Sequence, residues 1–406
     1  MRKPEILAPA GNLEKLKIAV IYGADAVYLG GEQYSLRAAA GNFSLREMAE
    51  GVEFAHRYGR KVYVAVNIFA HNRDLAELPG YLKEIAVLGV DGLIISDPGV
   101  LALARETVPE LPVHLSTQAN TTNWASVRFW QEQGVKRVVL ARELSLEEIK
   151  TIRERTSVEL EAFVHGAMCM AYSGRCLLSS FFTGRSANRG ACTHPCRWRY
   201  HLVEETRPGR YLPVTEDERG TYILSPRDLC MIAHIPDLAR AGLDSWKIEG
   251  RMKSIHYVAT VVKTYREALD LFWEDPERYR FRPEWLSELK KVSDRGFTTG
   301  FYFGQPHREE PGKERERPEV QFVGLVLDHP FPGLALVEQR NHFRVGDVLE
   351  VLEPEGEPSV FRLEELYDEA GAPLEAAPHA RQRVYLAAPK KLTPYSLLRR
   401  RVESDA

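Results

Sequence analysis

Residues 89–95 read GVDGLII, which is a glycine, a short turn and a run of apolar residues. The same order recurs at residues 23–29 (GADAVYL), 134–140 (GVKRVVL) and 242–248 (GLDSWKI). In each copy a helical pattern ends on the glycine, which is the usual residue just past a helix end, and an apolar strand follows. The repeat therefore predicts that helices and strands alternate along the chain.

With these four copies included, the chain has eight short apolar segments, nearly all of them separated by amphipathic helices. Eight βα units of this length predict a (β/α)8, TIM-like barrel, in which functional groups lie at the carboxyl ends of the strands. A doubly wound open sheet is the alternative, but the count of eight favours the barrel, and no GxGxxG motif supports a dinucleotide fold. The predicted strands are residues 5–8, 26–29, 61–66, 92–95, 113–116, 137–140, 159–164 and 245–248.

The composition is that of an ordinary globular protein, and 406 residues are enough for two domains. Hydrophobic residues make up 44% of the chain and charged residues 27%, and the formal net charge is −3. A chain this close to neutral is not a generally basic nucleic-acid binder, so any such role would need a local basic patch. No apolar stretch approaches the length of a membrane span and no leader pattern precedes the first strand, so we expect the protein in the cytoplasm.

A charge- and proline-rich segment, residues 306–319 (PHREEPGKERERPE), has no apolar period and predicts a linker between two domains. The first domain would be residues 1–305. Short alternating strands in residues 320–406 predict a small antiparallel β-barrel. The chain then closes on a basic tail that we expect to be solvated or to bind phosphate, formed by Lys390, Lys391, Arg399, Arg400 and Arg401.

Four of the five cysteines lie within residues 162–203, which contain no Asp or Glu, and the fifth follows a short way on. Thiols in a purely cationic segment predict a soft-metal or iron–sulfur site that faces an anionic substrate. Spacing alone also leaves zinc open, whereas a disulfide suits a reducing cytosol poorly. We expect residues 165–235 or so to form an insertion at the barrel mouth, between the seventh and eighth strands. The cysteines are Cys169, Cys176, Cys192, Cys196 and Cys230.

Polar residues that follow the predicted strands give a candidate site at the barrel mouth. Loop solvation and helix capping explain many such residues, and Asp97 before Pro98 is a candidate cap. The full set of strand-end residues is Glu32, Asn67, Asp97, residues 116–120, Arg142, Glu143, His165, Lys247, Glu249 and Arg251. From it we predict catalytic roles for His165, Lys247, Glu249 and Arg251, and substrate binding by Asn67, Gln118 and Arg142, together with Arg175, Arg185 and Arg189 of the insertion.

Residues 161–179, EAFVHGAMCMAYSGRCLLS, closely resemble the signature of the collagenase-like peptidase family U32. The resemblance extends to LAPAGN at residues 7–12, STQANTTN at 116–123, SWKIEGR at 245–251 and a C-terminal VGLVL…VEQRN…VGD pattern. Within the family, the chain is most similar to the branch that forms 5-hydroxyuridine at the wobble position of tRNA, a modification linked to prephenate. Related members hydroxylate ubiquinone precursors without molecular oxygen and carry a 4Fe–4S cluster.

This resemblance implies a 4Fe–4S cluster held by Cys169, Cys176, Cys192 and Cys230, with Cys196 as an extra thiol that replaces one of them in another relative. It implies tRNA as a partner, prephenate as co-substrate, and a second domain similar to a β-barrel of translation factors. A paralogous U32 subunit is a further expected partner, because family members can act in pairs.

The family label implies a competing function, which is peptide hydrolysis. The sequence contains neither GxSxG nor HExxH, so the remaining hydrolytic arrangement is a dyad of Cys169 with His165. A cluster would consume that thiolate. A non-catalytic subunit that carries the cluster is the third function consistent with the sequence.

Overall fold

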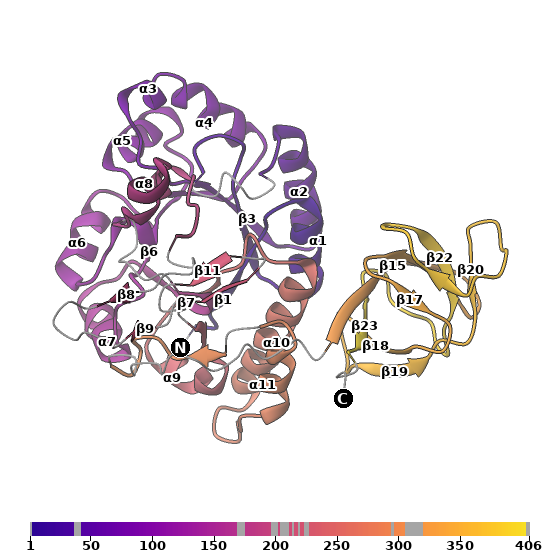
Figure 1. Cartoon of the computed structure of the whole chain (residues 1–406). Coiled ribbons are helices and arrows are strands. Elements are labelled where there is room, and N and C mark those ends of the chain that lie inside the picture. The colour runs from indigo at the N-terminus through magenta and orange to yellow at the C-terminus, as the bar shows by residue number, and fades with distance from the viewer. Residues whose placement is uncertain are drawn as a thin grey trace.

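A computed structural model of the chain describes residues 2–35, 42–168, 175–195, 227–293, 296–304 and 320–402, together with four short strands between residues 202 and 222. Eight parallel strands pair in sequence order, and pairing of the last with both β1 and β7 closes the barrel (Figure 1). The predicted TIM-like barrel is confirmed. Its strands are β1 (Glu5–Pro9), β2 (Ala26–Leu29), β3 (Lys61–Val66), β4 (Gly92–Ile95), β5 (Val113–Leu115), β6 (Arg137–Val139), β7 (Glu159–Ala167) and β13 (Ser245–Ile248).

Helices surround this barrel (Figure 1), and several of them begin at a serine or aspartate that caps the helix N-terminus. Ser44 and Ser145 each form a capping box, and Asp97 caps α5 by accepting from the backbone N–H groups of Gly99 and Val100. The helices are α1 (Leu13–Ile21), α2 (Leu45–Arg57), α3 (Asn72–Leu75), α4 (Leu78–Val87), α5 (Pro98–Thr107), α6 (Trp124–Glu132), α7 (Leu146–Arg155), α9 (Ile235–Arg240), α10 (Ile255–Glu274) and α11 (Pro283–Lys290). Among the described residues, no helix has the length and apolarity needed to span a membrane.

The repeated glycine–aspartate turn has a structural reason at both of its residues. The glycine at each of the four helix ends has a positive φ, between 76° and 104°, which costs glycine little. The aspartate two residues later accepts a hydrogen bond from a backbone N–H of the neighbouring strand. Asp25 bonds Ile6 at 2.9 Å, Asp91 bonds Val62 at 2.8 Å, and Asp244 bonds Leu160 at 2.9 Å. Each of these turns therefore also fastens the start of the adjacent strand.

The predicted insertion follows β7 and contains a helix, a 3₁₀ turn and short strands. Two antiparallel pairs of short strands lie within residues 198–224, and the rest of that range lies outside the described residues. The chain then re-enters the barrel sheet antiparallel to β7. The elements are α8 (Leu178–Thr183), η2 (Ala187–Arg189), β8 (Leu202–Val203), β9 (Tyr211–Leu212), β10 (Thr215–Asp217), β11 (Gly220–Tyr222) and β12 (Asp228–Cys230), which also pairs with β14 (Phe297–Thr298).

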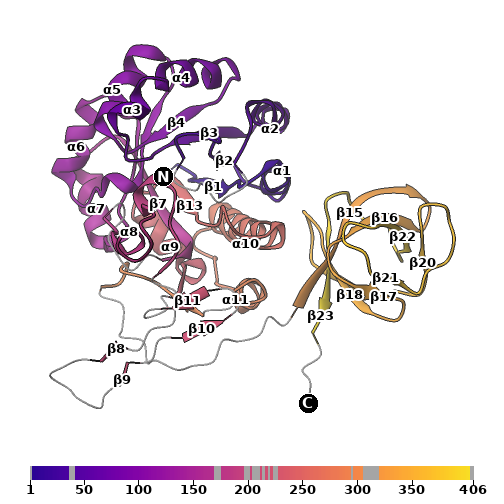
Figure 2. The same cartoon turned by 45° about the horizontal axis from the view of Figure 1, so that its top comes forward.

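The second domain is a seven-stranded antiparallel sheet that curls on itself, in the order β19-β18-β23-β15-β16-β22-β20 (Figure 2). The predicted linker, residues 306–319, lies outside the described residues, and the domain begins at its far side. The strands are β15 (Val320–Phe331), β16 (Leu334–Gln339), β18 (Val348–Leu352), β19 (Ser359–Arg362), β20 (Leu366–Tyr367), β22 (Arg383–Ala387) and β23 (Leu397–Arg401), with β17 (Phe343–Arg344) paired to β21 (Ala376–Ala377) outside this sheet.

The predicted basic tail is corrected at Arg399, Arg400 and Arg401, which lie in a strand, whereas Lys390 and Lys391 are exposed. Residues 397–401 form β23, a central strand of the sheet between β15 and β18. Arg399 is fully buried and forms ion pairs with Glu288 of α11 and Glu350 of β18. A charge enclosed in this way is neutralised inside the protein and cannot contact phosphate.

The second domain has a buried apolar core of its own, and three of its leucines also pack against the barrel. Leu325, Leu352 and Leu397 of the second domain belong to the same buried apolar cluster as the barrel residues. The Tyr22 hydroxyl of the barrel donates to the carbonyl oxygen of Leu352 at 2.8 Å, and Lys263 of α10 donates to that of Glu353 at 2.9 Å. These contacts fix the second domain against the barrel helices.

Candidate functional site

The floor of the barrel lumen is a network of buried charges. Lys247 Nζ lies 2.7 Å from Glu161 Oε1, and Arg137 bridges the other oxygen of Glu161 at 3.2 Å and Glu5 at 2.6 Å. Glu161 is completely buried. Burial alone would raise its pKa, but the positive charges of Lys247 and Arg137 lower that pKa to about 2. The predicted catalytic Lys247 is therefore a paired cation, and its partner Glu161 was not predicted.

Above this floor, aromatic rings separate the buried charges from the mouth. Lys247 Nζ lies 4.5 Å from the ring centre of Tyr28 and 5.6 Å from that of Phe163. The guanidinium of Arg142 covers the other part of the same layer, 3.9 Å from the Phe163 ring centre, and lies 3.6 Å from Glu249 Oε2. Contact between a cation and the face of an aromatic ring is electrostatically favourable. The structure thus brings Arg142 and Glu249 together, whereas Lys247 lies on the other side of the rings, in the network of the floor.

The rim of the mouth is made of amides and hydroxyls. Asn67 Nδ2 donates to Ser116 Oγ at 3.4 Å, and the backbone carbonyl oxygen of Asn67 accepts from the Ser96 hydroxyl at 3.0 Å. Gln118 follows in the 3₁₀ turn η1 (Thr117–Ala119), where its backbone N–H donates to the same Ser116 hydroxyl at 3.3 Å. The predicted binding residues Asn67 and Gln118 therefore meet at the ends of β3 and β5.

Arg251 lies beside the mouth, buried and held by the loop that follows β2. Its guanidinium donates to Ser35 Oγ and to Asn42 Oδ1, both at 2.8 Å. A methyl group on Gly30 would lie 2.4 Å from this guanidinium, so the loop has room for Arg251 only because residue 30 is glycine. These contacts are those of a positioning residue, and a catalytic role for Arg251 stays a prediction.

The placement of His165 in the mouth is wrong, and the reason is an irregularity in β7. Lys247 pairs with Phe163, but Ile248 pairs with His165, so Val164 is an extra residue in the ladder. Such a bulge reverses which side chains face the lumen. The ring of His165 lies outside, between Tyr257, Tyr265 and Phe297, with centroids 5.6 to 5.9 Å away. Burial, helped by the charge of Lys253, lowers its pKa to about 3.

Three of the five cysteines are among the described residues, and none of these three is in a disulfide. Cys176 and Cys192 are half-buried in the insertion, whereas Cys230 is buried opposite His165 on β12. Burial raises the pKa of the Cys230 thiol to about 11. Predicted ligand Cys169 and the extra Cys196 lie outside the described residues.

Unpaired thiols in an acid-free segment suit an iron–sulfur cluster chemically, because thiolates are its preferred ligands. Within the described ranges, however, no three His, Cys, Asp or Glu side chains lie close enough together to hold a metal ion. The three described thiols therefore do not form a complete cluster site by themselves.

The predicted substrate-binding arginines of the insertion fall into two kinds. Arg189 donates to both carboxylate oxygens of Asp74, at 2.8 and 3.0 Å, and to the carbonyl oxygen of Phe69 at 2.9 Å. It anchors the insertion to the loop after β3, so the prediction that Arg189 binds substrate is corrected to an anchoring role. Arg175 and Arg185 are exposed, and no described acidic group pairs with either.

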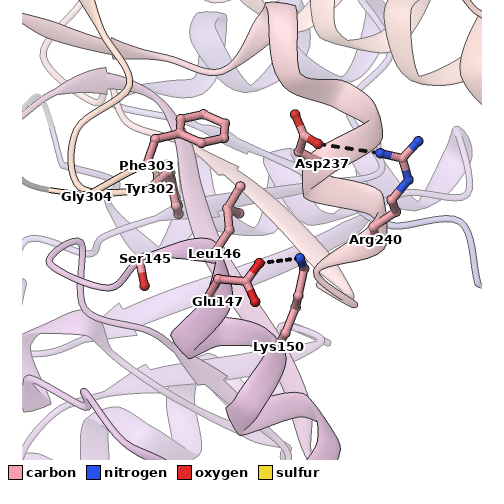
Figure 3. Close-up of a pocket in the computed structure, with 9 residues that line it drawn as sticks. All are labelled: Ser145, Leu146, Glu147, Lys150, Asp237, Arg240, Tyr302, Phe303 and Gly304. Atoms are coloured by element: carbon pink, nitrogen blue, oxygen red, sulfur yellow. Dashed lines mark hydrogen bonds and ion pairs between the residues drawn. The ribbon is translucent and has the colours of Figure 1, made fainter.

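A pocket of about 390 Å³ lies away from these residues, on the outer wall between α7 and α9 (Figure 3). Its charged side chains are paired along their own helices, Glu147 with Lys150 and Asp237 with Arg240. None of the predicted site residues lines it. The pocket offers no reactive group, and the barrel mouth remains the candidate site.

Sequence reasoning missed two residues of the lumen, Tyr28 in the ring layer and Glu161 in the floor. The Tyr28 hydroxyl donates to the carbonyl oxygen of Ile248 at 3.0 Å and lies 3.4 Å from Glu249 Oε2. A signal for Glu161 was present, since it is an acid inside the apolar run of β7, as Lys247 is a cation inside that of β13. Opposite charges within two buried strands indicate a pair.

Fold and mouth together define a (β/α)8 barrel protein with a cysteine-rich insertion over its functional end. The sequence matches peptidase family U32 over residues 11–311 and the C-terminal domain of that family over residues 318–399. The chain therefore belongs to peptidase family U32.

Relatives in this family include proteins named for RNA hydroxylation. The "tRNA hydroxylation protein P1" of Bacillus subtilis (strain 168) is 47% identical over 402 residues, which cover 98% of this chain and 95% of the relative. The "tRNA hydroxylation protein P2" of the same organism is 39% identical over 306 residues, or 75% of this chain and 98% of the relative. The "23S rRNA 5-hydroxycytidine C2501 synthase" of Escherichia coli (strain K12) is 39% identical over 67% of this chain and 40% of the relative.

Proposed function

We propose that this protein is a tRNA hydroxylase that places a hydroxyl group on carbon 5 of the wobble uridine, independently of molecular oxygen. The observation that carries the proposal is the 47% identity, over nearly the whole chain, to a protein named for tRNA hydroxylation. The relative named as a 5-hydroxycytidine synthase supports position 5 of a pyrimidine as the site of reaction.

The barrel mouth suits a planar base and an anionic co-substrate. The side-chain amide of Asn67 lies at the rim, where it can bond the edge of a uracil, and the half-exposed Gln118 beside it is a second candidate for this contact. Arg142 lies over the Phe163 ring at the mouth, 3.6 Å from Glu249 Oε2, where its guanidinium can bind a substrate carboxylate. We propose prephenate, which is a dicarboxylate, as that co-substrate.

Lys247 has a different part in this proposal. Its charge is already matched by Glu161 at 2.7 Å, and rings of Tyr28 and Phe163 cover it. A cation so enclosed and paired holds Glu161 and the ring layer in place without contacting the co-substrate. We therefore assign Arg142 to direct carboxylate binding and Lys247 to the structural support of that site.

For the cofactor, we propose a 4Fe–4S cluster with Cys169, Cys176, Cys192 and Cys230 as ligands, which would supply redox chemistry beside the mouth. Protein purified without oxygen should absorb in a broad band near ~400 nm, where zinc is silent. Replacing any of the four by Ser should cost iron and sulfide, and Cys196→Ser should cost less. Full iron retention in the Cys230→Ser protein would reject this ligand set.

The reaction is tested by mass spectrometry of tRNA nucleosides from a strain that lacks the gene and is grown without oxygen. Derivatives of 5-hydroxyuridine should disappear and return with the wild-type gene. The Arg142→Lys gene should restore them only partly, because Lys lacks the bidentate fork, whereas Arg128→Lys on the outer face of α6 should restore them fully. Normal nucleosides in the deletion strain, together with collagen or gelatin cleavage by the protein, would favour the peptidase function.

A second candidate is a non-catalytic subunit that carries the cluster for a paralogue. The presence of two such proteins, P1 and P2, in Bacillus subtilis favours this candidate. Hydroxylation of tRNA by the purified chain alone, with prephenate added, would exclude it. A requirement for a co-purified paralogue would support it.

A further inference from the structure

Helix α8 of the insertion has its apolar side chains on the outside. Leu177 and Phe181, one helical turn apart, are 70% and 82% exposed, and Phe182 beside them is 45% exposed. The two phenylalanine rings contact each other edge to face, with centroids 5.2 Å apart. Large apolar residues gathered in this way, and not scattered singly, mark an interaction surface.

The inner face of the same helix is polar and fully engaged. Ser179 is buried and its hydroxyl lies 3.0 Å from that of Thr193, while Thr183, one turn further on, lies 3.2 Å from the same hydroxyl. This inverts the usual arrangement, in which a surface helix turns its apolar face inward. Because these hydrogen bonds hold α8 against the rest of the insertion, the exposed rings have a fixed position on the surface.

The surface is also positively charged. Arg175 and Arg185 flank the apolar residues, both are exposed, and no described acid neutralises them. Residues 162–203 contain no Asp or Glu. Aromatic rings for stacking beside cations for phosphates are the features with which proteins bind unpaired nucleotides, because every base has a π-face and every nucleotide a negative charge.

The anchoring contacts place this surface at the functional end of the barrel. Arg189 and the backbone of Asn188 bond Phe69, which follows β3 at its carboxyl end, at 2.9 and 3.1 Å. In the view of Figure 1, α8 lies within the outline of the ring of outer helices. A nucleic-acid loop bound on α8 would therefore hold its neighbouring nucleotides near the mouth.

We propose that Phe181 is a stacking platform for an unpaired base of the RNA loop whose target nucleotide enters the barrel mouth, and that Arg175 and Arg185 pair with phosphates on either side. The proposal rests on the proposed function for its choice of RNA. It adds a docking surface, separate from the residues of the mouth, that selects single-stranded loops over duplex RNA.

The test measures binding of an unmodified anticodon stem-loop RNA to the full-length protein by fluorescence anisotropy. Phe181→Ala should weaken binding about 5- to 150-fold, the range for loss of one stacked base. Phe181→Trp should bind like the wild type, whereas Phe181→Leu, which is apolar but not aromatic, should bind like the alanine variant. Phe129→Ala, which removes an equally large ring 52% exposed on α6, is the matched control and should change nothing.

Salt dependence separates the arginines from the ring. Arg175→Ala and Arg185→Ala should each lower the slope of log affinity against log salt by about 0.7, the value for one phosphate contact on a single strand. Phe181→Ala should leave that slope unchanged. A duplex RNA of equal length should bind the wild type and Phe181→Ala equally weakly, because its bases are not free to stack on the ring.

Wild-type affinity in both Phe181→Ala and Phe181→Leu would overturn the platform. Retained RNA binding with loss of a co-purified paralogue would overturn it too and assign α8 to a protein interface. Failure of the proposed function is a different result, since normal tRNA nucleosides in the deletion strain can coexist with RNA binding that depends on Phe181.

Discussion

The protein has two contrasting sets of cations, one buried in the barrel lumen and one exposed on the insertion. In the lumen, Lys247 and Arg137 are buried and both contact Glu161. In the insertion, Arg175 and Arg185 are exposed and face no described acid. A buried charge must be matched within the protein because water cannot solvate it there, whereas an exposed charge can wait for a ligand. Charges that stabilise the fold therefore differ from charges available to substrate by being paired, more than by their distance from the mouth.

The largest effect should follow from breaking the lumen pair. Lys247→Met leaves Glu161 buried with one cation fewer, and loss of one partner of a buried pair typically costs about 3–5 kcal/mol. Unfolding by urea should show this loss. The double variant Lys247→Met/Glu161→Gln should recover part of it, because no uncompensated charge remains. An unchanged unfolding midpoint in the single variant would show that water reaches Glu161.

Acid should weaken the same pair within a defined pH range. The folded-state pKa of Glu161 is about 2, below its ordinary value of 4.5, because Lys247 and Arg137 outweigh the effect of burial. Its contribution, roughly 3 kcal/mol, is therefore complete above pH 4.5 and is lost as the pH falls towards 2. The free energy of unfolding of the wild type should fall more steeply over this range than that of Glu161→Gln. Parallel curves would contradict the assigned pKa.

A third buried cation, Arg399, extends the comparison to the interface between the domains. Arg399→Met leaves Glu288 and Glu350 without it, although Lys291 still contacts both at 2.7 and 2.9 Å. We expect a loss of about 2–3 kcal/mol in the free energy of unfolding. The control is Arg401→Ala, two residues further along β23 and exposed, which should change stability by less than about 0.5 kcal/mol. Equal effects of the two variants would show that Arg399 is solvated.

Arg189 is an intermediate case, half-buried and paired with Asp74. Its hydrogen bonds are the main cause that lowers the pKa of Asp74 to about 2, so the pair persists until strongly acidic pH. Because the pair is partly solvated, Arg189→Ala should cost only about 1 kcal/mol overall. Hydrogen exchange should nevertheless rise in residues 175–195, which lose their anchor. Unchanged exchange there would assign the anchoring to other contacts.

The smallest effect on stability belongs to the unpaired cations. Arg185→Ala should change the free energy of unfolding by less than about 0.5 kcal/mol, since no partner is lost. The expected change in RNA binding makes this result informative, because a residue that does not support the fold but does support binding is a ligand contact. A stability loss comparable to that of Arg189→Ala would instead place Arg185 among the paired cations.

Strand positions were predictable from the sequence because periodicity and glycine turns are local signals. All eight barrel strands lie where the pattern placed them, and Asp25, Asp91 and Asp244 show why the turn recurs. The direction of His165 was not predictable. One extra residue in β7 reverses the alternation, and Gly166 in the same strand, with a φ of 109°, hints at an irregularity without giving its position.

The fate of the C-terminal basic run was equally hidden. Arg399 finds its partners 111 residues away in Glu288 and 49 residues away in Glu350, a distance along the chain that no short pattern reports. Composition alone predicted a solvated tail for the same residues. Lys247 with Glu161 was the easier case, because each lies inside an otherwise apolar strand.

The place of β23 in the second sheet has a consequence for biosynthesis. This strand comes last in the chain, yet it lies between β15 and β18, which therefore keep open edges until residues 397–401 have left the ribosome. Open strand edges invite pairing with other chains. The barrel, whose strands are all complete by residue 248, can form while synthesis continues, as N-terminal domains generally do. A chain that stops before residue 397 would therefore have a complete barrel and a second sheet in which β15 and β18 each expose an unpaired edge to other chains.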